Sequence, residues 1–360
     1  MSRQDIQHGR QADAAATGRF EPIHLATLQV ERCYEFDLYL PGQAGTGLYR
    51  ARHAPFTVED RDRLLANGVR FLQVAVADRA AYRAYLMGQL AALVINPHIA
   101  LPKRCAAIAD CAETVSRELI RNPEQPQAFE DAYALVRGVV DLVLREPRAI
   151  GNMVRMLKHD YYTYTHLVNV STLAVVLALQ MGIRDPQRLC RIGLGGLLHD
   201  IGKTRIDPEV LTTPSALNAR QMTELRRHPE YGLLILNHVP TVTGDVLRIV
   251  LEHHERLDGK GYPACLVGGE ISLDSQICAV ADIFDGMTCT RPYREALDVQ
   301  FALDYLGAQR GGRLDPKPVN AWLEMAQAWA DNGTEVINDA QVLAVGMVAG
   351  DGAGGQGDGP

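Results

Sequence analysis

Two adjacent histidines, His253 and His254, lie between acidic residues and directly before a glycine-rich loop. The stretch from Val250 to Pro263 reads VLEHHERLDGKGYP. Imidazole and carboxylate groups on neighbouring helices are the usual ligands of Fe, Mn, Ni or Zn, and the lack of a nearby cysteine pair argues against a structural thiolate site. The pair therefore indicates a metal site built from histidine and carboxylate.

A second adjacent pair, His199 and Asp200, lies in the segment GLGGLLHDIGKTRIDP. Its leucines have helical spacing, which predicts a helix that stops at Gly202, with Lys203 just beyond it. Neighbouring residues on a helix point about 100 degrees apart, so both can reach metal only if it lies against the helix edge. Such a dipeptide alone is more often a surface accident or a hydrogen-bonded core histidine.

Further ionisable side chains begin or line other predicted helices. His166 heads the most apolar helix, His228 starts a helix just before Pro229, and Asp282 and Asp285 lie on the polar side of another. Buried ionisable groups must be paired or metal-bound, because unpaired burial costs several kcal/mol. The alternative is a set of polar residues satisfied by hydrogen bonds alone.

These segments, in this order, resemble the HD-GYP family, a subgroup of the HD-domain phosphohydrolases that degrade cyclic di-GMP. The motifs are HDYYTYTHLVNV, LLHDIGK, HPEYG, HHERLDGKGYP and VADIFDGMTCTRPYR. The resemblance covers residues 155 to 320 and implies an all-helical domain that hydrolyses cyclic di-GMP to pGpG and/or GMP. It leaves two alternatives: a catalytically weak receptor or docking module, and a phosphodiesterase for another cyclic dinucleotide such as cyclic GMP-AMP.

The resemblance also implies a set of site residues. One metal ion would be held by His166, His199, Asp200 and Asp282, and a second by His228, His253 and His254, with Asp200 bridging. Two divalent ions, Fe or Mn before Ni or Zn, would activate water and polarise a phosphodiester. Asp200 and Lys203 are the predicted catalytic residues, and Lys203, Arg291, Arg294 and Tyr262 are the predicted substrate contacts.

Several of these roles have alternatives. Lys203 also suits the end of a helix as a plain cation, and the two arginines could be surface partners of Asp285 or Glu295. Asp285 is expected to orient a metal ligand or an arginine. Tyr262 could face the substrate or a signalling protein that docks on the GYP loop.

A third metal ion occurs in some members of the family, associated with a glutamate four residues before the first histidine. Tyr162 occupies that position here. We therefore expect two ions per chain, with His159 and Asp160 as the side chains that could substitute for the glutamate.

The chain is expected to be mainly α, with a small α+β domain before the helical one. Residues 1–20 are predicted as a disordered tail, 21–125 as a regulatory α+β domain with a helical linker, 126–335 as the HD-GYP domain, and 336–360 as a flexible glycine-rich tail. The boundary rests on the two prolines of RNPEQPQ, residues 121–127, because proline breaks helices.

Composition narrows the class of partner. The formal charge of -7 disfavours binding of a nucleic-acid polymer, although a local basic cluster could hold a small phosphate ligand. Seven cysteines form no C-x-x-C pair and no signal peptide precedes them, which favours reduced thiols and a cytoplasmic location. No segment is apolar enough for a membrane span, and a homodimer is left open.

Overall fold

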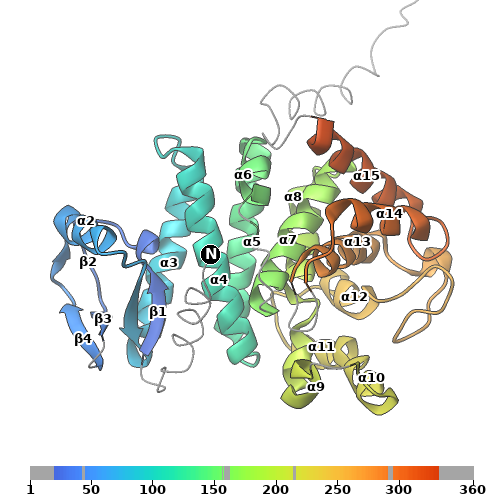
Figure 1. The fold of residues 1–360 in the computed structure, drawn as a ribbon, viewed down its shortest axis with the longest axis horizontal. Helices are drawn as coiled ribbons and strands as arrows, with labels where there is room; N and C mark the ends of the chain where they lie inside the picture. The colour runs from blue at the N-terminus through green and yellow to red at the C-terminus, as the bar shows by residue number, and fades with distance from the viewer. Residues whose placement is uncertain are drawn as a thin grey trace, which may run out of the picture. The chain divides into compact units, whose positions relative to one another are not determined.

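The computed structural model describes residues 20–42, 45–155, 157, 163–213, 216–290 and 295–331. It divides into two compact units, an N-terminal unit of residues 1–93 and a C-terminal unit of residues 94–360. The chain is mainly helical, with its strands confined to the N-terminal unit (Figure 1). This confirms the predicted fold class.

The N-terminal unit is built on a four-stranded antiparallel sheet in the order β1-β6-β3-β4. Its strands are β1 (Phe20–His24), β6 (Phe71–Ala75), β3 (Leu38–Gly42) and β4 (Gly45–Arg50), and β2 (Arg32–Cys33) pairs with β5 (Pro55–Phe56). Apolar residues alternate along these strands, so Ile23, Leu38, Leu72 and Val74 fall on one face and are buried. Helix α2 (Val58–Ala66) starts at a capping box formed by Thr57 and Asp60.

The division between the units falls near the end of α3 (Arg79–Ile95), so the predicted boundary at residue 126 lies within the C-terminal unit. Pro126 is the first residue of α5 (Pro126–Arg145), a position that needs no backbone N–H. The preceding α4 (Leu101–Arg121) packs against α5. The prolines therefore connect two packed helices. The functional division at residue 126 stays a prediction.

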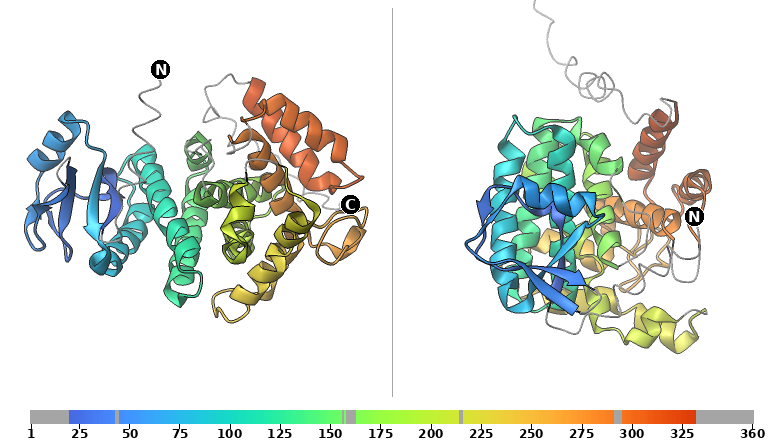
Figure 2. Two further views of the ribbon diagram at one scale, coloured as in Figure 1. Left: turned by 60° about the horizontal axis from the view of Figure 1, so that its bottom comes forward. Right: turned by 60° about the vertical axis from the view of Figure 1, so that its left-hand side comes forward.

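The described residues of the C-terminal unit form helices joined by loops (Figure 2). After α5 come α6 (Ala149–Arg155), α7 (Thr163–Gln180), α8 (Pro186–Leu198), α9 (Pro208–Thr212), α10 (Ala219–Leu225), α11 (His228–Leu236), α12 (Gly244–Glu252), α13 (Leu273–Thr288), α14 (Val299–Gln309) and α15 (Pro316–Asp331). The apolar α7 packs on both α8 and α13 and is buried along most of its length. It therefore forms the centre of this unit.

None of the helices within the described ranges is long and apolar enough to cross a membrane. All seven cysteines fall in these ranges and carry free thiols, and Cys33 and Cys265 are the exposed ones.

Candidate metal centre

The seven predicted ligands come from five parts of the C-terminal unit. His166 lies in the first turns of α7, and His199 and Asp200 follow the last residue of α8. His228 is the first residue of α11, and Asp282 lies within α13. His253 and His254 directly follow α12. The helix packing brings residues up to 116 positions apart (166 to 282) into one site.

These residues form two groups. Within each group, the potential ligand atoms all lie within 4.8 Å of one another. The first group is His166, His199 and Asp282, and the second is Asp200, His228, His253 and His254. All except His254 and Asp282 are buried, and those two are half-buried. The structure thus brings all seven predicted ligands together, with Asp200 in the second group. Their binding of metal ions stays a prediction.

Asp200 connects the two groups through its two carboxylate oxygens. Its Oδ2 atom lies 3.4 Å from Nε2 of His199 and 3.7 Å from Nε2 of His166. Its Oδ1 atom lies 3.2 Å from Nε2 of His228 and 4.0 Å from Nε2 of His253. One oxygen therefore faces each group, the arrangement that a bridging carboxylate requires.

Second hydrogen bonds orient the imidazole rings. The Nδ1 atoms of His199, His228 and His253 each lie 2.8 Å from a backbone carbonyl oxygen, of Gly196, Leu225 and Val250 respectively. A neutral imidazole carries one proton, so donation from Nδ1 leaves a lone pair on Nε2. The three lone pairs then point into the site, ready to bind a cation.

The three histidines of the second group are neutral at neutral pH, which favours cation binding there. Burial lowers the pKa of His228 to about 4 and that of His254 to about 3, and it lowers the pKa of His253 well below the ordinary value. Burial also acts on His166, but hydrogen bonds to Asp282 and Asp285 outweigh it and raise the pKa to about 10. A metal ion at His166 would therefore displace a proton from Nε2.

The two carboxylates of the site are ionised. Burial raises the pKa of Asp200, but Lys203 and His199 outweigh this effect and hold it well below the ordinary value. Burial also raises the pKa of Asp282, but the hydrogen bond from His166 outweighs it and holds this pKa well below the ordinary value. The site therefore combines ionised carboxylates with the neutral imidazoles of His228, His253 and His254, donors that suit a divalent transition metal.

Two atoms of this site are among the buried polar side-chain atoms that make no hydrogen bond within the described residues: Nε2 of His199 and Oδ1 of Asp200. An unpaired buried polar atom costs about 1 to 3 kcal/mol, so a native site rarely keeps one without a ligand. Both atoms face the groups described above, and metal ligation would satisfy them. The residues present thus fit a pair of metal ions.

Comparison with known families decides the class of this domain. A family model described as HD domain matches residues 140–317. Residues 140–317 form an HD domain. The recognition of the family from sequence motifs is therefore confirmed.

The HD domain has characterised relatives among bacterial phosphodiesterases. A cyclic di-GMP phosphodiesterase of Pseudomonas aeruginosa is 35% identical over 224 residues, which cover 62% of this chain and 54% of that protein. A cyclic di-GMP phosphodiesterase response regulator of Xanthomonas campestris is 39% identical over 60% of this chain and 57% of its own length. The chain thus spans about half the length of these relatives.

Other relatives are named for a different cyclic dinucleotide. A 3'3'-cGAMP-specific phosphodiesterase of Vibrio cholerae is 35% identical over 43% of this chain and 34% of that protein. Among solved structures, the HDG"Y"P protein Bd1817 of Bdellovibrio bacteriovorus matches with a TM-score of 0.64. It is 20% identical and covers 86% of this chain and 99% of its own, which supports the fold alone.

Gly202 lies in the turn that follows His199 and Asp200, which is called the HD turn below. Its lack of a side chain lets the backbone of this turn pack directly against the backbone of α11. A Cβ atom at this position would lie 1.9 Å from the carbonyl oxygen of His228 and 2.4 Å from the backbone nitrogen of Gly232. The prediction that Gly202 stops the helix was wrong, because α8 ends at Leu198. The glycine instead permits the close backbone approach that brings His228 to Asp200.

The GYP loop lies beside the second group of ligands and is held in place by Glu255. Buried Glu255 accepts hydrogen bonds from the backbone nitrogens of Ala264 (2.6 Å) and Leu266 (3.0 Å). A Cβ atom at Gly261 would lie 2.5 Å from Cα of Glu255, so only glycine fits there. The Tyr262 ring lies 4.6 Å from the His254 ring, which places it at the edge of the metal centre.

Asp285 and Lys203 support the ligands from outside. Asp285 accepts hydrogen bonds of 2.7 Å from both Nδ1 of His166 and the side-chain nitrogen of Asn169. It therefore orients His166, one of the two roles predicted for it. Lys203 donates to Oδ2 of Asp200 at 2.5 Å. Sequence reasoning missed Asn169, whose only signal was its position three residues after His166 on an apolar helix.

Other predicted site residues lie outside the described residues. They are Arg291 and Arg294, together with His159, Asp160 and Tyr162, which bear on the third metal ion. His238 is exposed and belongs to neither group.

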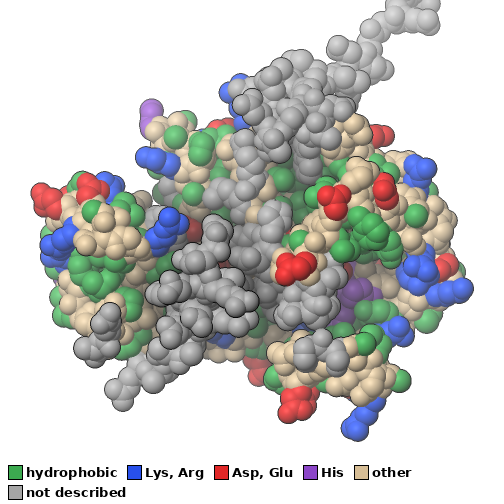
Figure 3. Space-filling model, viewed as in Figure 1, with side chains coloured by type: hydrophobic (Ala, Val, Ile, Leu, Met, Phe, Trp, Pro, Cys, Tyr) green, Lys and Arg blue, Asp and Glu red, His purple; other side chains and the backbone are tan. Residues whose placement is uncertain are grey.

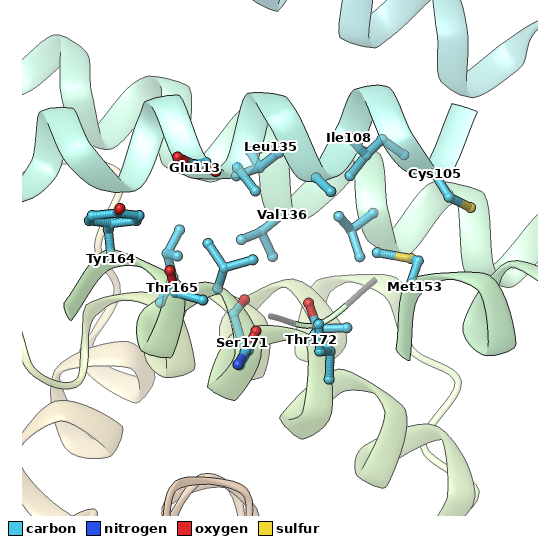
Figure 4. A pocket seen from close by; sticks show the side chains of 17 residues that line it. Cys105, Ile108, Glu113, Leu135, Val136, Met153, Tyr164, Thr165, Ser171 and Thr172 are labelled. Atoms are coloured by element: carbon cyan, nitrogen blue, oxygen red, sulfur yellow. The ribbon is translucent and has the colours of Figure 1, made fainter. Parts of the chain in front are cut away.

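A mainly apolar pocket lies on another side of α7, between α4, α5 and α6 (Figure 4). Cys105, Ile108 and Met153 line one end, and Glu113 and Tyr164 lie at the other. It contains none of the seven candidate ligands. Figure 3 shows a patch of histidine surface in a recess of the C-terminal unit.

Proposed function

We propose that this HD domain hydrolyses cyclic di-GMP to pGpG and/or GMP at a centre of two metal ions. The observation that carries the proposal is Asp200, whose two oxygens each face one group of ligands. Relatives named as cyclic di-GMP phosphodiesterases at 35% and 39% identity support the substrate.

His166, His199, Asp282 and one oxygen of Asp200 would hold one ion, and His228, His253, His254 and the other oxygen of Asp200 would hold the second. When bound, divalent ions of this kind lower the pKa of water and polarise a phosphodiester, and Fe or Mn suits the donors ahead of Ni or Zn. Four protein ligands per ion would leave positions open for water and substrate.

The protein's own residues prepare this chemistry in three ways. Backbone carbonyl groups hold three imidazoles in the tautomer that points Nε2 inward. Asp285 holds the ring of His166 in place. Lys203 lies beside Asp200, where its charge would offset negative charge that develops on the phosphate oxygens.

Cyclic GMP-AMP is the second candidate substrate, because relatives of Vibrio cholerae are named as specific for it. A receptor without activity is a weaker candidate, since a receptor does not need all seven side chains brought together. Docking of a signalling protein at the GYP loop, a regulatory role for the N-terminal unit and a homodimer remain parts of the proposal. Exposed Lys260 at the tip of the loop is the side chain that a partner could contact.

The test is turnover of both dinucleotides by full-length protein loaded with Fe or Mn under anaerobic conditions. We expect linear or monomeric products from cyclic di-GMP at a higher kcat/KM than from 3'3'-cGAMP, and none from a variant carrying both His199→Ala and Asp200→Ala. Binding without turnover of either compound would instead identify a receptor. Activity retained by the double variant would refute the metal centre.

A further inference from the structure

Arg226, which is neither a predicted metal ligand nor a predicted substrate contact, lies beside Tyr262 of the GYP loop. Arg226 follows α10 and comes two residues before His228. Its guanidinium carbon lies 5.5 Å from the centroid of the Tyr262 ring, and that ring lies 4.6 Å from His254. Tyr262 thus contacts Arg226 at the surface and His254, a member of the second group of ligands.

Arg226 keeps its charge available at the surface. It is exposed, and across the described residues its guanidinium has no carboxylate within ion-pair distance. The next residue, Arg227, is also exposed, but it pairs with Glu224 at 3.5 Å and lies over the ring of Tyr231 instead of Tyr262. An arginine over an aromatic ring is held in position by a cation–π contact while its N–H donors stay accessible.

The two cations near the centre are at different depths. Lys203 lies directly against the carboxylate of Asp200. Arg226 lies one aromatic ring farther out, beyond Tyr262. A cyclic dinucleotide carries two phosphodiester groups on opposite sides of its ring, and one cut breaks only one of them. The group that does not react must therefore be bound some distance from the metal ions.

We propose that Arg226 binds the non-reacting phosphodiester of the cyclic dinucleotide and so selects substrates that carry two phosphates. This inference rests on the proposed function. Arginine suits the task because its planar guanidinium can donate two parallel hydrogen bonds to one phosphate. Tyr262 then acts as the support that holds the guanidinium at the mouth of the site.

The test compares Arg226→Ala, Arg226→Lys and the control Arg227→Ala on two substrates. Cyclic di-GMP has two phosphodiesters, whereas bis(p-nitrophenyl) phosphate has one and no second group for Arg226 to bind. A hydrogen bond to a charged group contributes about 1.5 to 3 kcal/mol, or roughly tenfold to a hundredfold in affinity. We therefore expect the KM of Arg226→Ala for cyclic di-GMP to rise at least tenfold, with kcat within about threefold of the wild type.

The second substrate and the control complete the comparison. The KM for bis(p-nitrophenyl) phosphate should rise less than twofold, Arg226→Lys should recover part of the lost affinity, and Arg227→Ala should match the wild type. An equal loss on both substrates, or no loss on cyclic di-GMP, would overturn the proposal. If the wild type binds cyclic di-GMP without turnover, the proposed function fails, and calorimetric affinities of the same variants still decide the role of Arg226. If the wild type neither binds nor cleaves either cyclic dinucleotide, both proposals fail.

Discussion

The Nε2 atoms of His228 and His253 lie 3.2 Å apart, and each ring already uses Nδ1 to donate to a backbone carbonyl group. In neutral rings so arranged, two lone pairs face each other, which is unfavourable unless a cation lies between or beside them. Two ligands of one metal ion have this spacing. The pair therefore indicates a metal ion in the second group more directly than any single residue does.

Asp200→Asn should remove metal from both groups, because each oxygen of Asp200 faces a different one. We expect the metal content, measured by mass spectrometry after anaerobic loading, to fall from two ions per chain to one or fewer. Asp62→Asn, at an exposed position in the N-terminal unit, is the matched control and should keep both ions. Two tightly held ions in the Asp200 variant would show that this carboxylate is not a bridge.

Acidification should destabilise the metal-free protein. His228 has a folded-state pKa of about 4, below its ordinary value, so unfolding lets it take up a proton. The stability that it contributes is present above about pH 6.5 and is lost as the pH falls toward 4. The pKa of His166, raised to about 10, acts in the opposite sense and weakens the fold only as the pH rises from 6.5 toward 10.

The measurement is the Tm of metal-stripped protein between pH 7 and pH 4. We expect the Tm to fall with pH, and to fall less steeply in His228→Gln than in the wild type. His98→Gln, at an exposed histidine, should follow the wild-type curve. Parallel curves for all three proteins would mean that His228 is not held neutral by burial.

Gly202→Ala should separate the HD turn from α11, because its Cβ atom would lie 1.9 Å from the carbonyl oxygen of His228. Overpacking of this kind costs about 1 to 3 kcal/mol, and more when the contact is backbone to backbone. Denaturant unfolding should show this loss together with weaker metal binding. Gly244→Ala, which meets no atom within 4 Å, should be neutral or slightly stabilising. Equal stability of the two variants would contradict the close approach.

Asp285→Asn should weaken metal binding without removing a ligand. The carboxylate accepts the proton on Nδ1 of His166, and loss of such a partner typically lowers metal affinity about tenfold to a hundredfold. Competition with a chelator measures the change. Asp274→Asn, on the same helix but paired with Arg188, serves as the control. Unchanged affinity in Asp285→Asn would assign Asp285 to packing alone.

The sequence predicted the candidate metal ligands better than the residues that contact and orient them. Seven candidate ligands could be named because their motifs resemble those of the HD-GYP family, and the structure brings all seven together. Asn169 and Arg226 could not be found this way. Asn169 matters through a contact with Asp285 on another helix, and Arg226 through its approach to Tyr262.

Close backbone contacts and the boundary between the two units could not be predicted from the sequence either. Gly202 has the appearance of a helix stop in the sequence, whereas its function depends on a helix that packs from elsewhere in the chain. The prolines near residue 126 break the helix as expected, but the helices on either side pack together. A local pattern predicts where an element ends, and only packing determines which elements form one unit.

Anomalous diffraction from crystals of the protein loaded with Fe or Mn tests the central claim most directly. We predict two peaks, one among His166, His199 and Asp282 and one among His228, His253 and His254, with an oxygen of Asp200 bound to each. A single peak, or two peaks that Asp200 does not bridge, would contradict the account.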